Sequence, residues 1–168
     1  MHPLAELVKR SVEAFISQGR TIEPPDPLPD SMTGKAGVFV CIKKHGQLRG
    51  CIGTFQPTCG SIGAEAIANA ISAATNDPRF PSVSGAELPD LTYSVDVLSS
   101  PERVSGISDL APKKYGVIVV SGQRRGLLLP DLEGVNTAEE QIRIAKMKAG
   151  IFPGEEIEIY RFEVMRYS

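Results

Sequence analysis

The stretch VFVCIKKHGQLRGCIGTF, residues 38–55, decides the fold because it has the pattern of two β-strands joined by a tight turn. The expected strands are residues 38–44 and 48–55, with the turn at 45–47. The second strand contains QLRGCIGT, in which a cysteine stands between two glycines. Glycine inside a strand usually marks a bulge or a place where a ligand or another backbone comes close. The hairpin is therefore expected either to pack closely against a neighbour or to present its thiol to a substrate.

Helical patterns stand on both sides of this hairpin. Residues 3–18 place their apolar side chains on one face, and residues 61–75 repeat isoleucine and alanine at helical spacing. The proline-rich run at 24–29 should cross the surface in extended form. A capping box at 137–140 begins a third helix that Gly150 ends. Helices are thus expected before the hairpin, directly after it, and again near the end of the chain.

More strands follow the second helix. An alternating pattern predicts a strand at 92–98, and an apolar run predicts a central strand at 115–121. Residues 122–126 are interpreted as a turn into a short strand at 127–129, and residues 156–167 as one closing strand with a bulge. Strands joined by hairpins and interrupted by helices predict an α+β fold with a mainly antiparallel sheet and flanking helices. We detect no internal repeat.

Composition narrows the class of protein. The 168 residues are 42% hydrophobic and 23% charged with a net charge of -2, as in ordinary globular proteins and unlike nucleic-acid binders. We expect a single domain over residues 1–168. Because no apolar run approaches the roughly 20 residues of a membrane span and the N-terminus is charged, we expect no membrane association and a cytoplasmic location. Cys41, Cys51 and Cys59 are expected to be reduced thiols.

Three segments carry a family resemblance. LRGCIGT at 48–54, DPRFP at 77–81 after an alanine-rich helix, and GLLLP at 126–130 resemble the marker segments of the AMMECR domain family. The resemblance covers residues 4–165. It implies an α+β domain with a smaller subdomain beside the main sheet, a candidate catalytic or binding site at LRGCIG, and no established reaction. It also implies, as possible partners, a Memo-type protein and a radical-SAM enzyme.

Cys51 is the candidate catalytic nucleophile. Simple alternation would place Arg49, Cys51 and Gly53 on one face of the strand, where the guanidinium would lower the pKa of the thiol. In the alternative interpretation, Cys51 is a small buried side chain, and the glycines exist so that the helix at 61–75 can pack. We expect Gly50 and Gly53 to serve close approach rather than a left-handed turn.

The DPRFP segment is the second half of the predicted site. Arg79 is the candidate clamp for an anion, with Asp77 orienting it. In the plainer alternative, Pro78 ends the helix and the two charged residues form only a local ion pair. The site residues expected to bind a small anionic ligand, in a cleft between strand and loop, are Arg49, Gly50, Gly53, Asp77 and Arg79.

The sequence offers few other catalytic groups. The only histidines are His2 and His45, and His45 is six residues from Cys51, roughly 20 Å along an extended strand. It can therefore be neither the base of a Cys-His pair nor a zinc co-ligand of Cys51, and we expect no metal or other cofactor. Arg124 and Arg125 are interpreted as solvated turn residues. Two functions stay open: an enzyme or small-molecule binder, and a protein-interaction module.

Overall fold

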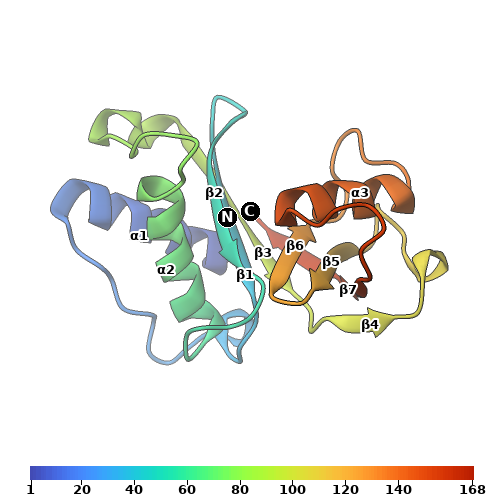
Figure 1. Ribbon diagram of the computed structural model, residues 1–168. Helices are drawn as coiled ribbons and strands as arrows, with labels where there is room; N and C mark the ends of the chain where they lie inside the picture. Colours follow the sequence, from blue (N-terminus) through green and yellow to red (C-terminus); the bar gives the residue numbers. More distant parts are fainter. The chain divides into compact units, whose positions relative to one another are not determined.

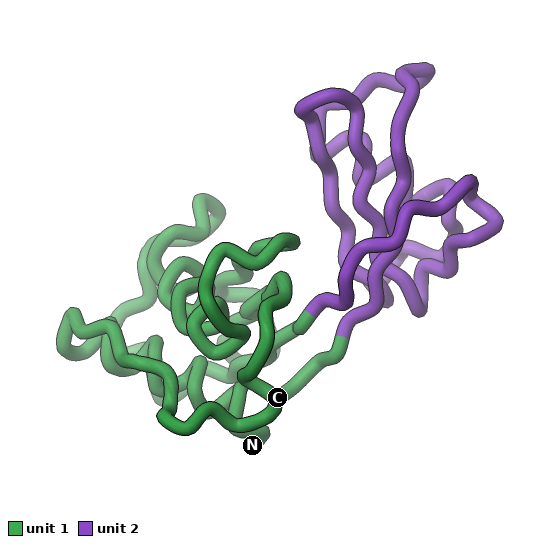
Figure 2. Tube along the Cα trace, turned by 90° about the horizontal axis from the view of Figure 1, so that it is seen from below, with its two compact units in different colours: residues 1–97, 165–168 green, residues 98–164 purple.

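The computed structural model describes residues 1–168 and divides the chain into two compact units. Unit 1 comprises residues 1–97 and 165–168, and unit 2 comprises residues 98–164 (Figure 2). Each unit contains one four-stranded sheet with helices packed on it. The predicted α+β class is confirmed, with two separate sheets in place of one.

Unit 1 is built on a sheet with the strand order β2-β1-β3-β8. Its strands are β1 (Val38–Lys44), β2 (Gln47–Thr54), β3 (Leu91–Leu98) and β8 (Val164–Tyr167). Its helices are α1 (Pro3–Gln18) and α2 (Ile62–Thr75), with short 3₁₀ turns η1 (Asp30–Met32) and η2 (Gly85–Asp90). Both long helices lie on the same side of the sheet (Figure 1), so one sheet face forms the core of the unit.

Alternation along β1 separates that core face from the other face. Val38, Val40 and Ile42 are completely buried and pack into the cluster that includes α1 and α2. The residues between them point to the face that these helices do not cover, and there Cys41 is half-buried. This second face carries the site described below.

Unit 2 has a sheet with the strand order β4-β7-β5-β6. Its elements are β4 (Glu102–Val104), η3 (Ile107–Asp109), β5 (Gly116–Ser121), β6 (Arg124–Leu128), α3 (Ala138–Ala149) and β7 (Glu158–Phe162). Helix α3 packs on the β5–β6 hairpin, where Val117, Leu128 and Ala145 belong to one buried cluster (Figure 1). Unit 2 therefore has a hydrophobic core of its own.

The structure corrects the predicted turn at 122–126. The turn is limited to Gly122 and Gln123, so Arg124, Arg125 and Gly126 are strand residues of β6. Gly126 is buried, and a Cβ atom added there would lie 1.9 Å from the Ala145 carbonyl oxygen. Gly126 thus permits close packing of α3 and does not belong to the turn, in which the prediction placed it.

The single strand predicted at 156–167 is also wrong, because β7 and β8 belong to different sheets. The break falls at Glu163, whose N–H donates to Ser99 Oγ (2.8 Å), while the Ser99 N–H donates to the Glu163 carbonyl (2.9 Å). These two residues hold together the points where the chain enters and leaves unit 2.

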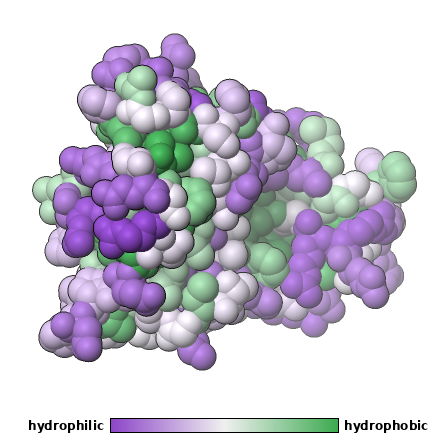
Figure 3. Space-filling model, turned by 90° about the vertical axis from the view of Figure 1, so that its left-hand side faces the viewer, coloured by the Kyte–Doolittle hydropathy of each residue, from purple (hydrophilic) through white to green (hydrophobic).

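The face of the molecule on the side of α1 and α2 has a mixed character. On the side where α1 and α2 lie, hydrophilic residues (purple) and hydrophobic residues (green) are interspersed (Figure 3). No helix has the length and apolarity needed to span a membrane.

Candidate functional site

The free edge of β2 brings the two predicted halves of the site together. The backbone N–H of Cys51 donates to Asp77 Oδ2 (2.9 Å), and its carbonyl accepts from Arg79 Nη2 (3.3 Å). The loop after α2 therefore occupies the place where another strand would pair, and it satisfies backbone groups that an edge strand leaves open. The predicted proximity of the DPRFP loop to Cys51 is confirmed.

These two hydrogen bonds define how Cys51 faces its neighbour on β1. Because its N–H and C=O both point off the edge, Cys51 cannot exchange backbone hydrogen bonds with Cys41, the residue directly opposite in the register. The two cysteines form a non-hydrogen-bonded pair, the arrangement in which opposite side chains come closest. Both are half-buried, and both have free thiols.

The two thiols influence each other's ionisation. A hydrogen bond from Cys51, opposed by burial and assisted by the nearby charge of Lys43, lowers the pKa of Cys41 to about 7. The same hydrogen bond, together with burial, raises the pKa of Cys51, while the positive charge of Arg79 opposes that rise. The predicted lowering of the pKa at Cys51 is thus wrong, and the thiolate of this pair forms first at Cys41.

Asp77 and Arg79 form the charged part of the site. Arg79 donates through Nε to Asp77 Oδ1 (3.0 Å) and through Nη2 to Oδ2 (2.8 Å). These hydrogen bonds hold the pKa of Asp77 well below its usual range. The Asp77 side chain is 1% exposed whereas that of Arg79 is 55% exposed. Asp77 is therefore a buried anchor that fixes a half-exposed guanidinium, whose Nη1 makes no hydrogen bond within the chain.

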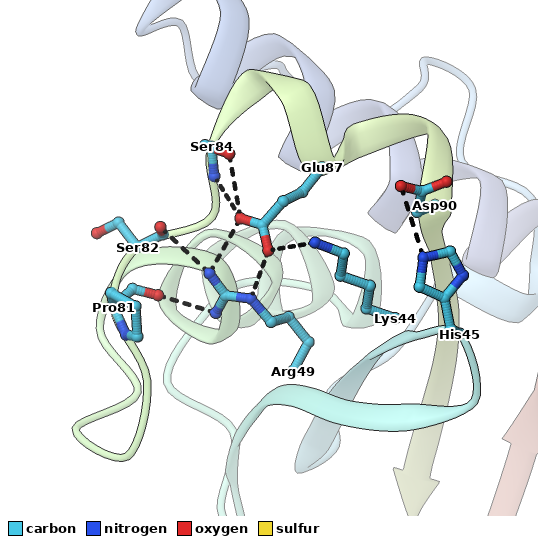
Figure 4. A network of polar contacts seen from close by, with 8 residues as sticks. All are labelled: Lys44, His45, Arg49, Pro81, Ser82, Ser84, Glu87 and Asp90. Atoms are coloured by element: carbon cyan, nitrogen blue, oxygen red, sulfur yellow. Dashed lines mark hydrogen bonds and ion pairs between the residues drawn. The ribbon is translucent and has the colours of Figure 1, made fainter.

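Arg49 is engaged elsewhere. Its guanidinium donates to both carboxylate oxygens of Glu87 (2.9 and 3.1 Å) and to the carbonyls of Pro81 (2.8 Å) and Ser82 (3.3 Å), as Figure 4 shows. This ion pair lowers the pKa of Glu87, with further contributions from Ser84 and Lys44. Arg49 therefore ties β2 to the loop that follows α2.

The bulge at Arg49 explains why simple alternation is misleading there. Ile42 pairs with Gly50 but Lys43 pairs with Leu48, so Arg49 is the extra residue. A β-bulge breaks the period of two. Strand alternation therefore cannot decide whether Arg49 and Cys51 share a face, and that expectation stays a prediction. The Arg49 side chain is 12% exposed in its own ion pair with Glu87.

Both glycines of the motif permit close approach, as expected. A Cβ atom on Gly50 would lie 2.1 Å from the Ala73 carbonyl oxygen of α2, and one on Gly53 would lie 2.2 Å from the Phe39 ring. Neither glycine has a positive φ. The packing interpretation accounts for Gly50, which is buried beneath the helix, while a binding role for either glycine stays a prediction.

Sequence reasoning missed Cys41 and Glu87. The turn predicted at 45–47 pairs Lys44 with Leu48, and continuing that register places Cys41 opposite Cys51, so the thiol pair could have been found. Glu87 could not, because no short-range pattern links it to Arg49. No group of three or more His, Cys, Asp or Glu side chains is arranged to hold a metal ion.

A groove with a volume of about 460 Å³ lies in unit 2 rather than at these residues. It is lined by Arg103, Val104, Ser105, Ile157, Glu158 and Ile159. None of them belongs to the predicted site, so the cleft expected between β2 and the DPRFP loop stays a prediction.

The chain is thus an α+β protein in which a strand cysteine is held at a sheet edge by an Asp-x-Arg loop. The AMMECR1 family model matches residues 5–167, which span both units, and the chain belongs to this family. A protein of Thermotoga maritima is 54% identical over 170 residues, covering 99% of this chain and 98% of the relative. Protein CA_C1420 of Clostridium acetobutylicum is 49% identical over 168 residues, covering 99% of this chain but only 36% of the relative.

A solved structure agrees with the fold. The crystal structure of the uncharacterised protein PH0010 from Pyrococcus horikoshii aligns with a TM-score of 0.89 at 33% identity. The alignment covers 97% of this chain and 88% of that one.

Proposed function

We propose that this protein binds a small anionic ligand, a carboxylate or a phosphate, through Arg79 beside the thiols of Cys51 and Cys41. The observation that carries the proposal is the state of Arg79: fixed by a buried carboxylate, half exposed, and with Nη1 still able to donate. A guanidinium held in this way binds an oxyanion with little further loss of side-chain freedom. In this proposal Asp77 orients Arg79, and Arg49 and Gly50 hold the strand and loop in place.

A nucleophilic role for the thiol pair of Cys51 and Cys41 is part of this proposal. The pair supplies a thiolate near neutral pH because the pKa of Cys41 is lowered to about 7. The positive charge of Arg79 also acts on both sulfur atoms. An anionic substrate on Arg79 would therefore be held next to a reactive sulfur. In this proposal the protein acts in the reducing cytoplasm and without a metal.

Calorimetric titration with inorganic phosphate and with short dicarboxylates tests this function. We expect saturable binding that Arg79→Gln weakens at least about tenfold, the effect of losing one charge-assisted hydrogen bond. Arg124→Gln is the matched control, because Arg124 is 42% exposed and is likewise paired with a carboxylate, that of Glu155 in unit 2. Equal binding by all three proteins would reject Arg79 as the anion site.

A second candidate function is that of a protein-interaction module. In the Clostridium acetobutylicum relative, the region matching this chain is 36% of a longer protein. A family member thus occurs covalently joined to other sequence, as expected for a module that works beside a partner. A Memo-type or radical-SAM protein is the partner that the family resemblance implies.

Co-purification with a Memo-type and with a radical-SAM protein from the same genome tests this alternative. A stable complex that survives Arg79→Gln would favour the module over the anion binder. Elemental analysis of the purified protein tests the expected absence of a bound metal, which stoichiometric zinc or iron would contradict.

A further inference from the structure

We propose that Cys41 and Cys51 form a two-electron redox pair that closes to a cross-strand disulfide when the protein meets a low-molecular-weight disulfide such as oxidised glutathione. The inference does not depend on an anionic ligand. It assigns a modification site to two cysteines on neighbouring strands, one of which lies outside the LRGCIG motif.

The register carries the inference. Opposite residues of a non-hydrogen-bonded pair have Cα atoms about 4.5 Å apart, and a disulfide requires about 4.4 to 6.8 Å. Cys51 is held on one side by Asp77 and Arg79, and Cys41 pairs on its other side with Ser94 of β3. The backbone is thus already in position, and closure requires only rotation of the two side chains.

The sulfur atoms are also placed to react. Both cysteines are half-buried on the sheet face that α1 and α2 leave uncovered, so a small disulfide can reach them while a protein-sized oxidant has less access. Lys43 and Arg79 place positive charge near the thiols. These positive charges favour a thiolate, while the negative charge of Asp96 opposes it. The lowered pKa of Cys41, about 7, makes it the sulfur that attacks first.

The reaction balances with the oxidant named. The Cys41 thiolate attacks one sulfur of the disulfide RSSR, whose S–S bond breaks to release RS⁻ and leave a mixed disulfide on Cys41. Cys51 gives up its proton, attacks the Cys41 sulfur and releases the second RS⁻. Two protein thiols are oxidised by two electrons, and one RSSR is reduced to two thiols.

Redox titration in glutathione buffers, followed by mass spectrometry, tests the proposal. We expect the wild-type protein to lose the mass of two hydrogen atoms. Trypsin cleaves after Lys43, Lys44 and Arg49, which separates the peptide of Cys41 from the peptide that holds both Cys51 and Cys59. A linked pair of these peptides that is seen only without reductant, and that also forms in Cys59→Ser, identifies the bond. Cys59→Ser should behave as wild type, whereas Cys41→Ser and Cys51→Ser should retain a bound glutathione and never lose the two hydrogens.

Two results would overturn the proposal. One is a wild-type protein that accumulates glutathione on Cys41 or Cys51 without closing, and the other is a disulfide that includes Cys59. The outcome is separable from that of the anion-binding proposal, because Arg79→Gln should lose phosphate binding and still form the disulfide. If the Cys41–Cys51 disulfide fails to form in a protein that binds phosphate normally, only the redox proposal is rejected.

Discussion

The β1–β2 hairpin with α2 and the β5–β6 hairpin with α3 share one plan. The sequence GQLRG at 46–50 is matched by GQRRG at 122–126, and the first glycine of each has a positive φ, 80° and 61°. The second glycine of each lies beneath a helix: an added Cβ would be 2.1 Å from the Ala73 carbonyl in one and 1.9 Å from that of Ala145 in the other. The hairpins therefore meet their helices in the same way.

The helices repeat the correspondence. Four residues before each of these alanines is a buried amide side chain. Asn69 donates to the Val38 carbonyl (2.9 Å), and Gln141 donates to the Tyr115 carbonyl (2.8 Å). No repeat is detectable in the sequence, because the matched residues are few and are separated by loops of different length. The structure shows a shared supersecondary plan.

The difference between the hairpins shows which residues are left for function. The position of Cys51 is taken by Leu127 in unit 2, and that of Cys41 by Ile118. The Leu127 carbonyl accepts from Lys148 Nζ (2.7 Å) as the Cys51 carbonyl accepts from Arg79, but no carboxylate accepts from the Leu127 N–H. The Arg-Gly dipeptide occurs in both hairpins, although Arg49 is the extra residue of a bulge whereas Arg125 pairs with Val120. The thiol pair and the buried Asp77 belong to unit 1 alone.

The largest expected effect tests the shared scaffold. Gly50→Val and Gly126→Val should each lower the free energy of unfolding by about 3 kcal/mol, because the new side chain meets a helix carbonyl that cannot move away. Urea unfolding followed by amide signals from each unit measures both. Ala should be tolerated better than Asn, and Asn better than Val, at either position. Asn as the best replacement would show that the glycine serves a left-handed conformation instead.

The next effect tests the difference at the strand edge. Asp77→Ala should destabilise unit 1 by about 2 kcal/mol, because the Cys51 N–H and the Arg79 guanidinium lose their acceptor. Lys148→Met, the matched change in unit 2, should cost less because this side chain is exposed. Chemical denaturation compares the two variants. Equal losses of unfolding free energy would mean that the edge strands β2 and β6 are held equally firmly, which would contradict the difference between the two hairpins.

Acid should destabilise unit 1 at a higher pH than unit 2. Asp77 and Glu87 have pKa values lowered in the fold, so they stabilise unit 1 above the ordinary carboxyl pKa of about 4. That stability is lost as the pH falls below this value toward the lowered pKa values. Amide signals of Gly50 should therefore broaden or shift at higher pH than those of Gly126. Simultaneous loss of both would contradict the conclusion that the carboxyl groups with the most strongly lowered pKa values lie in unit 1.

The smallest change in stability is expected when the cysteine pair of unit 1 is replaced with the residues that stand at the same positions in unit 2. Cys41→Ile with Cys51→Leu copies the Ile118–Leu127 pair into unit 1 and should change the free energy of unfolding by less than about 1.5 kcal/mol. Rapid alkylation by iodoacetamide near pH 7 should disappear, leaving only Cys59. The single change Cys59→Ser should keep the rapid reaction. Unchanged alkylation in the double variant would remove the reactive thiol from this pair.

The sequence predicts most of the fold because its signals are local. Periodicity finds α1 at its observed bounds, and the hairpin pattern finds β1 and β2. It fails at Gly126, where a packing glycine resembles a turn glycine, and at Glu163, where hydrogen bonds with distant Ser99 divide the last strand.

The site was predictable to the same extent. Asp77 and Arg79 are predictable because they are close in sequence, and the sequence also predicts the contact of their loop with Cys51. The ion pair of Arg49 with Glu87 joins residues 38 positions apart, and only the folded chain brings them together. The raised pKa of Cys51 depends on a thiol on another strand, so no reading of the LRGCIG segment alone could supply it.

Unit 2 is an insertion into unit 1, and the two hydrogen bonds between Ser99 and Glu163 join the residues at which the chain enters and leaves it. Because β3 and β8 are neighbours in one sheet and these hydrogen bonds join their ends, the intervening residues could be gained or removed without a change in the path of the rest of the chain. A chain in which a short turn links Leu98 directly to Val164 would keep every strand of the first sheet. Unit 1, which carries the thiols, could thus occur without unit 2, and the two units could have separate evolutionary histories.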